Sequence, residues 1–348
     1  MSTESAVRGD LSVFLATPAS KDPGQVYRDA LGAVELADAL GYSYVWVTEA
    51  HFTPVIGVPA ALSLLAAATQ VAERIRLGTA VIPLAFDNPL RVAETAALVN
   101  ALSGQRLELG VGKGNPRGFS TDAYNAFGLD EGDRNHLFAQ ALSALKTALR
   151  GSVVADGKEL NLYPPAEDLL DRVWQATGDH ATAAAAGAAG DGLQLFRTTP
   201  DGVAGDVQSL LIDSYLSSFD PSRGAPRIGI SRSLLLASSR REAIEIATAE
   251  FEERDTGHPQ RPESTDAKSV EEYLIKSDIA FGAADDVVET LSHDAAVVRS
   301  TNYLFNFPFA PSGSPAFREG LEVLAAEVYP RLRRDEEAFT VRSGTAER

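Results

Sequence analysis

Residues 44–52 read Y-V-W-V-T-E-A-H-F, an apolar run that ends in a carboxylate and an imidazole. The run is continuously apolar and does not alternate, as expected for a strand of a parallel sheet that is covered on both faces. Glu49 and His51 follow where this strand should end. In barrels of parallel strands, polar residues at the carboxyl ends of strands face the active site. We therefore predict catalytic roles for both side chains; the alternative is that His51 is a buried core residue.

Runs of the same kind recur along the chain and alternate with segments of helical period. The predicted strands are residues 11–17, 44–50, 77–84, 107–112, 172–177, 192–196, 227–237 and 301–308. The predicted helices include residues 25–40, 58–73, 89–103, 134–150, 239–254 and 316–334, with end signals at Gly41 and Pro89. Eight strands that alternate with helices predict a single (β/α)₈ TIM-type barrel over residues 10–335, with flexible termini at 1–9 and 336–348. A doubly wound open sheet is the alternative.

Two polar segments interrupt this alternation. Residues 115–132 follow the fourth predicted strand and are rich in Gly, Asn and Asp, and residues 255–272 are polar and contain proline. In a barrel, both would be loop insertions at the C-terminal face, where loops form the active site. The alternative for the second segment is a surface loop without a functional role.

Composition narrows the classes of function. The chain of 348 residues has a net charge of −17, so we expect no nucleic-acid partner, because phosphate contacts need clustered Lys and Arg. It has no cysteine and five scattered histidines, so we predict neither disulfides nor a metal site. No stretch approaches the roughly 20 apolar residues of a membrane-spanning helix. The apolar residues 11–20 lack the positively charged flank of a signal peptide. We therefore expect a cytoplasmic protein with no membrane partner.

A glycine-rich segment, G-V-G-K-G-N at residues 110–115, ends the fourth predicted strand. It has neither the Walker spacing nor the G-x-G-x-x-G pattern, because residue 115 is Asn. Lys113 is the only cation of the segment and is therefore the candidate for contact with an anion. The alternative is a strand end whose glycines permit close approach of another backbone.

Taken in order, several segments resemble the bacterial luciferase-like flavin-dependent monooxygenases. The most specific are Y-V-W-V-T-E-A-H-F (44–52), R-I-R-L-G-T-A-V-I-P-L-A-F-D-N-P-L-R-V-A-E (74–94) and L-S-G-Q-R-L-E-L-G-V-G-K-G (102–114). Weaker likenesses follow at R-V-W-Q-A-T (172–177) and F-G-A-A-D-D-V (281–287). The resemblance implies a barrel that binds FMN at its C-terminal mouth and uses reduced flavin and oxygen on a small organic substrate.

The resemblance also implies roles for single residues. Glu49 and His51 would belong to an E-H-H-F motif beside the flavin. Ala50 replaces the first His of that motif, so any proton transfer would fall to His51 or to the substrate itself. Thr79 and Ala80 would contact the flavin where relatives have a non-prolyl cis peptide. Lys113 stands in place of a flavin-contacting arginine, with Asn115 close to it, and Arg134 would be a second phosphate cation. Thr177 and Gly178 would bind the phosphate at a helix N-terminus. Asp179 is unfavourable to a phosphate unless it caps that helix.

The implied partners follow from the same resemblance. Relatives dimerise through the second and third barrel helices, and the corresponding segment at residues 59–70 is rich in alanine. We therefore expect a homodimer, and a separate reductase that supplies reduced FMN. The alternative cofactor is a deazaflavin, in a hydride-transfer oxidoreductase of the same fold. A flavin-binding protein without turnover is the alternative from outside the enzymes.

Overall fold

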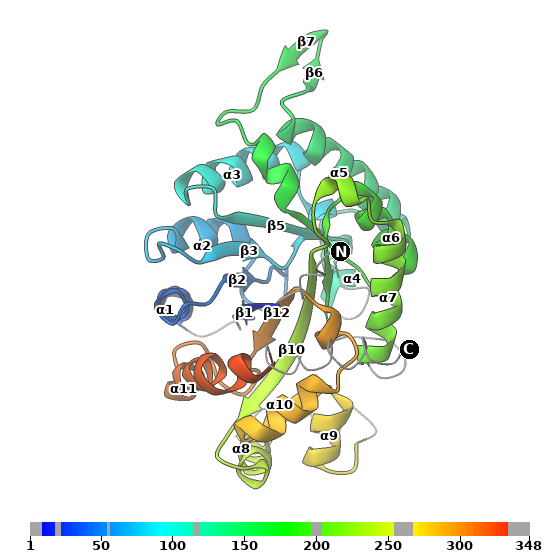
Figure 1. Cartoon of the computed structure of the whole chain (residues 1–348). Helices are drawn as coiled ribbons and strands as arrows, with labels where there is room; N and C mark the ends of the chain where they lie inside the picture. Colours follow the sequence, from blue (N-terminus) through cyan, green and yellow to red (C-terminus); the bar gives the residue numbers. More distant parts are fainter. Residues whose placement is uncertain are drawn as a thin grey trace, which may run out of the picture.

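The computed structural model describes residues 9–17, 22–53, 56–114, 119–196, 204–253 and 267–332. Its centre is a closed barrel of eight parallel strands surrounded by helices (Figure 1). In sheet order the strands are β1 (Asp10–Leu15), β2 (Tyr44–Val47), β3 (Arg76–Thr79), β5 (Leu107–Gly112), β8 (Val173–Ala176), β9 (Gly192–Leu195), β10 (Ile228–Leu236) and β12 (Asn302–Asn306). β12 pairs with β1 and closes the ring. The predicted TIM-type barrel is therefore confirmed, and the open sheet is excluded.

Both faces of these strands are buried, which explains their continuously apolar sequences. All six residues of β5 are buried, as are all four of β9. Within β9, Leu193 and Leu195 pack in the main core between the barrel and its helices. Because side chains alternate along a strand, Gln194 points into the barrel.

Within the described part of the chain, nine helices surround the barrel, several of which begin at a side-chain cap. They are α1 (Pro23–Ala39), α2 (Ala61–Ala68), α3 (Pro89–Leu102), α5 (Arg134–Leu149), α6 (His180–Ala189), α7 (Ala204–Ser218), α8 (Arg240–Glu253), α10 (Ala284–Ser292) and α11 (Pro315–Val323). Asp22 caps α1 and Asn88 caps α3, each followed by a proline at the start of the helix. Such a proline loses nothing there, because the first N–H groups of a helix have no partner within it.

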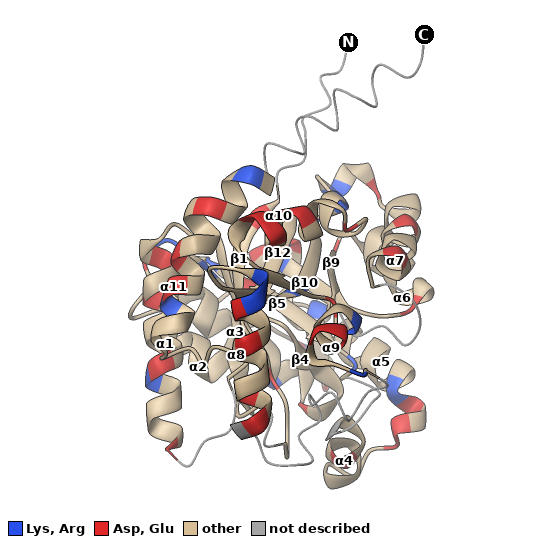
Figure 2. Ribbon diagram, turned by 90° about the horizontal axis from the view of Figure 1, so that it is seen from below, with Lys and Arg blue, Asp and Glu red and all other residues tan. Residues whose placement is uncertain are grey.

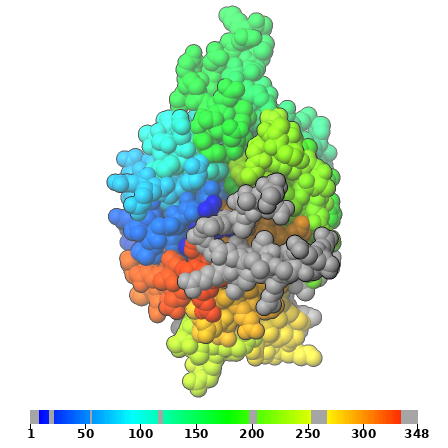
Figure 3. All heavy atoms as spheres, in the orientation of Figure 1, coloured from blue at the N-terminus to red at the C-terminus, as the bar shows by residue number. Residues whose placement is uncertain are grey.

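Two additions outside the barrel are absent from the sequence prediction. β11 (Ile279–Gly282) pairs with the C-terminal end of β10 as a further parallel strand. β6 (Val153–Ala155) and β7 (Lys158–Leu160) form an antiparallel hairpin that projects from the barrel at the top of Figures 1 and 3. The strands of the hairpin are largely exposed, so they lack the continuous apolar run by which the barrel strands were predicted.

The predicted insertions are described only in part. Residues 119–132 contain the short helix α4 (Phe119–Ala126), and the described end of the second insertion leads into α9 (Val270–Lys276). The predicted flexible termini lie outside the described residues, apart from Gly9. A short strand, β4 (Ile82–Pro83), follows β3 and pairs with β5.

Charged residues lie mainly on the outer helices. In Figure 2 acidic residues occur along α8, α10 and α11. No helix among the described residues combines the length and the apolar character needed to cross a membrane. Within the same residues, no three His, Asp or Glu side chains form a group that could hold a metal ion.

Candidate active site

Glu49 and His51 lie at the C-terminal mouth of the barrel, in the segment that follows β2. Glu49 is 9% exposed, and its Oε2 accepts a hydrogen bond of 2.7 Å from the backbone N–H of Ala61. Ala61 is the first residue of α2, so the carboxylate satisfies one of the N–H groups that a helix start leaves unpaired. The other oxygen of Glu49 lies 3.4 Å from His51 Nε2. Glu49 is thus fixed by a helix and lies next to the imidazole.

His51 Nε2 is buried and has no hydrogen-bond partner among the described residues. The side chain is 13% exposed. Its ring meets Phe86 and Phe127 edge to face, with centroids 5.4 and 5.3 Å away. A buried polar atom without a partner is costly in a finished core but common where a ligand binds. His51 therefore presents a buried ring nitrogen at the mouth that makes no hydrogen bond within the described residues and lies next to the Glu49 carboxylate.

An aromatic wall surrounds this imidazole; it consists of Phe52, Phe86, Tyr124 and Phe127. Phe86 stacks on Phe127 at 5.2 Å and meets Tyr124 at 4.7 Å. Phe52, which is 67% exposed, has a positive φ of 54°. Tyr124 and Phe127 come from the predicted insertion after β5, which the sequence placed at this face without naming either residue. Their common position depends on contacts between distant segments, so no local signal could have identified them.

Lys113, the predicted anion partner, is already neutralised within the protein. Its Nζ donates to Asp179 Oδ2 at 2.7 Å, Asn135 Oδ1 at 2.8 Å and Thr182 Oγ1 at 2.9 Å. An ammonium group has three N–H donors, so these three acceptors use all of them. No sequence pattern connects Lys113 with Asn135 or Thr182, which lie 22 and 69 residues further along the chain.

Asp179 caps α6 and is the counter-ion of Lys113. Its Oδ1 accepts from the backbone N–H of Thr182 at 2.8 Å. Partial burial alone would raise the pKa of Asp179, but the hydrogen bonds from Lys113 and Thr182 outweigh it and lower the pKa to about 2. The carboxylate is therefore charged at every pH above about 3. Asp179 therefore has the helix-capping role, which is the condition for its compatibility with a nearby phosphate.

The remaining predicted residues lie around the same end of the barrel. Arg134 is half-buried and donates to the carbonyl of Gly114 at 2.6 Å, and no further hydrogen bond of its guanidinium is made within the described residues. Thr177 Oγ1 donates to Asp179 Oδ2 at 2.9 Å. A Cβ atom added to Gly178 would meet nothing within 4 Å, so there is open space at this residue. Asn115 lies outside the described residues.

Thr79 and Ala80 lie where β3 ends. Thr79 Oγ1 donates to the carbonyl of Gly110 at 2.7 Å and accepts from the N–H of Gly110 at 2.9 Å. The non-prolyl cis peptide joins Ala80 to Val81, one bond later than the Thr79–Ala80 pair. Ala80 is buried inside the barrel beside Trp46 and Trp174. Thr79 therefore connects β3 to β5 through its hydroxyl group. Of the two predicted residues, only Ala80 takes part in the cis peptide bond.

A sequence model of the luciferase-like monooxygenase family matches residues 10–298. The chain belongs to this family. The predicted resemblance to this family is thereby confirmed.

Individual proteins resemble this luciferase-like chain to different extents. Limonene 1,2-monooxygenase from Rhodococcus erythropolis is 29% identical over 58% of this chain. The matches with four curated relatives span 66, 47, 35 and 53% of those proteins' own lengths.

Solved structures resemble the fold over nearly the whole chain. The oxygenating constituent of 3,6-diketocamphane monooxygenase of Pseudomonas putida, in complex with FMN, has a TM-score of 0.73 at 14% identity, covering 93% of this chain and 98% of that one. An F420-dependent secondary alcohol dehydrogenase has a TM-score of 0.66 at 16% identity, covering 93% and 99%. At these identities the likeness concerns the barrel alone.

Proposed function

We propose that the protein is an FMN-dependent monooxygenase that uses reduced flavin and oxygen to oxidise a small organic substrate. The observation that supports this most directly is the buried Nε2 of His51 at the mouth of a luciferase-like barrel, which makes no hydrogen bond within the described residues and lies 3.4 Å from Glu49 Oε1. A histidine in this state can hold or transfer a proton next to a bound ligand.

The residues of the mouth fit FMN. Arg134 has guanidinium N–H groups free for a phosphate, and open space lies at Gly178 beside the Thr177 hydroxyl. Ala80, at the end of β3, presents only a methyl group where a flat ring would pack. Arg134, Thr177 and Gly178 would therefore hold the phosphate end, and Ala80 would contact the ring. Because Asp179 neutralises Lys113, the lysine would attract the phosphate only weakly.

The chemistry is then divided between the cofactor and the side chains. Reduced FMN would supply two electrons to O₂, so that one oxygen atom enters the substrate and the other leaves as water. His51 Nε2 would hold the proton that such a reaction needs, and Glu49, held by Ala61, would keep the imidazole in place. The aromatic wall would exclude water from the site.

We propose that a separate reductase supplies the reduced flavin. One solved structure of the same fold is the oxygenating constituent of a monooxygenase with FMN bound, which supports a division of labour here. The competing cofactor is a deazaflavin, used by another protein of the same fold. The competing function without turnover is simple flavin binding.

Titration with three flavins tests the proposal. We expect the fluorescence of FMN and of riboflavin to change on binding, whereas coenzyme F420 should bind at least tenfold more weakly. Oxygen consumption with reduced FMN and a panel of small organic compounds should then give an oxygenated product. Tight binding of F420 without FMN affinity would contradict the choice of cofactor, and FMN binding without any product would favour the binding-protein function.

Because Asp179 neutralises Lys113, we expect the protein to gain little affinity for FMN over riboflavin from the charge of the phosphate. We expect Asp179→Asn to bind FMN about three- to tenfold more tightly, because the amide still caps α6 but no longer neutralises Lys113. Riboflavin, which has no phosphate, should bind as it does to the wild type. Asp22→Asn, at the capping residue of α1, is the matched control and should change neither affinity. Unchanged FMN binding by Asp179→Asn would place the phosphate away from this pair.

A homodimer through α2 and α3 is the expected assembly. On α3, Leu98 and Leu102 lie four residues apart on one face of the helix and are 52% and 51% exposed, and adjacent exposed apolar side chains are a feature of interaction surfaces. Light scattering at micromolar concentration should give roughly twice the monomer mass of 36.9 kDa. Leu98→Glu should shift the protein to the monomer with little change in its thermal stability. A wild-type mass of one chain would refute the dimer.

A further inference from the structure

Gln194 is a polar side chain inside the barrel for which the fold alone provides no partner. It is fully buried, and neither its Oε1 nor its Nε2 has a hydrogen-bond partner among the described residues. A buried carboxamide without partners is unfavourable, since water satisfies the same atoms in the unfolded chain. Such a group is therefore retained where something other than the fold binds it.

The position of Gln194 is next to the proposed ring site. Gln194 is level with Ala176, the last residue of β8, and its backbone carbonyl accepts from the N–H of Thr177. A Cβ atom added to Gly110 would lie 2.9 Å from Gln194 Oε1 and 1.9 Å from the carbonyl oxygen of Thr79. The carboxamide thus lies near the end of β3, immediately before Ala80 and its cis bond.

The barrel wall makes room for this side chain. Gly110 on β5 and Gly229 on β10 both lie against it, since a Cβ at Gly229 would be 3.5 Å from Gln194 Cγ. Neither glycine has a positive φ, so the backbone would accept a side chain at either position and the restriction is one of space. Two glycines therefore accommodate one long polar side chain in the barrel interior.

We propose that Gln194 binds the imide edge of the flavin ring. A carboxamide offers an acceptor and a donor side by side, and an imide edge presents the complementary N–H and C=O groups in the same spacing. This assignment rests on the proposed flavin binding and adds to it the residue that recognises the ring itself. Gln194 is then a binding and orienting residue for the cofactor, with no proton to transfer.

The experiment compares flavins and variants by their dissociation constants. The wild type should bind 3-methylriboflavin, whose imide N–H is replaced by a methyl group, about tenfold more weakly than riboflavin. Gln194→Met, which keeps the length but removes both polar atoms, should bind FMN and riboflavin roughly 10- to 100-fold more weakly. It should also bind riboflavin and 3-methylriboflavin equally. Gln208→Met is the matched control, because Gln208 is a buried amide of α7 whose bond goes to the carbonyl of Phe196.

Each outcome separates this inference from the proposed function. If the wild type binds FMN, and Gln194→Met binds it equally well with the same preference for riboflavin over 3-methylriboflavin, the assignment to Gln194 is wrong while flavin binding stands. If the wild type binds no flavin, both fail. Gln194→Met should unfold at the same or a higher temperature without flavin, because it loses two unpaired polar atoms. If the variant fails to fold, the wild-type comparison decides alone: equal binding of the two riboflavins overturns the proposal.

Discussion

Replacing His51 by alanine should lower the turnover number with reduced FMN by roughly 10²–10⁴-fold, the usual contribution of a general acid–base group. The imidazole has a buried Nε2 with no partner among the described residues, and the Glu49 carboxylate lies 3.4 Å from it. No other histidine is placed in this way at the mouth within the described part of the chain, and Ala50 offers no group to replace it. Single-turnover oxidation of substrate with pre-reduced FMN measures the effect directly.

Binding and folding controls make this result specific. FMN affinity should stay within about threefold of wild type, because the expected phosphate contacts come from Arg134, Thr177 and Gly178. His293→Ala is the matched control, since His293 is the exposed residue that ends α10 and its Nδ1 pairs with the carbonyl of Glu289. Glu49→Gln should have a smaller effect on turnover than His51→Ala, because the amide can still hold the position. If His51→Ala turns over like wild type, His51 is a core residue after all.

The barrel could be predicted because its strands repeat one local signal. Each barrel strand is buried on both faces, so its sequence is apolar throughout, and the helices between strands show their own period and caps. β11 is buried and apolar like the barrel strands, but it is a further strand outside the eightfold alternation. The strands β6 and β7 are largely exposed and lack an apolar run. The Asp156–Gly157 turn that joins them, with positive φ at both residues, was the local signal for this hairpin.

The site could be predicted only where a residue's position along the chain determined its place in the fold. Glu49 and His51 follow a strand, and every strand end in a parallel barrel reaches the same mouth. Lys113 also follows a strand and lies at that mouth, but its charge is neutralised by Asp179, 66 residues later. Gln194 was missed because a single polar residue in an apolar strand has no pattern. Partners that are distant in sequence therefore set the charge and the recognition properties of the site.

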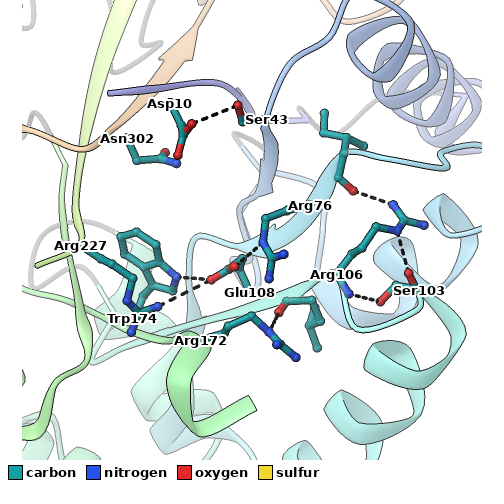
Figure 4. A network of polar contacts seen from close by, with 12 residues as sticks. Asp10, Ser43, Arg76, Ser103, Arg106, Glu108, Arg172, Trp174, Arg227 and Asn302 are labelled. Atoms are coloured by element: carbon teal, nitrogen blue, oxygen red, sulfur yellow. Dashed lines mark hydrogen bonds and ion pairs between the residues drawn. The ribbon is translucent and has the colours of Figure 1, made fainter. Parts of the chain in front are cut away.

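The largest effect on stability is expected at the opposite end of the barrel, where Glu108 is surrounded by cations (Figure 4). Glu108 is 3% exposed. Its Oε1 accepts from Arg76 Nε at 2.5 Å and its Oε2 accepts from Trp174 Nε1 at 2.6 Å. Arg227 Nη1 lies 3.8 Å from the same Oε2, and its guanidinium lies over the Trp174 ring at 4.9 Å. One carboxylate therefore accepts hydrogen bonds from Arg76 and Trp174 and forms a longer ion pair with Arg227.

Removing the Glu108 carboxylate should lower the free energy of unfolding far more than removing an exposed carboxylate. We expect Glu108→Ala to lower the free energy of unfolding by about 3 kcal/mol, at the lower end of the range for breaking a buried ion pair, because both arginines keep partial contact with water. The side chains of Arg76 and Arg227 are 31% and 25% exposed. Urea unfolding measures the change. Glu94→Ala, which breaks an exposed pair with Arg91, should change the stability by less than about 0.5 kcal/mol.

The same variant tests whether the two ends of the barrel act independently. Glu108 lies near the N-terminal ends of the strands, where polar residues of such barrels contribute to stability and not to catalysis. Below its unfolding transition, Glu108→Ala should therefore bind FMN with wild-type affinity, whereas His51→Ala should keep wild-type stability and lose turnover. Glu108→Gln should fall between Glu108→Ala and wild type in stability, since the amide oxygen can still accept one bond but the charge is lost. A Glu108→Ala variant as stable as wild type would show that Arg76 and Arg227 find sufficient solvation without the carboxylate.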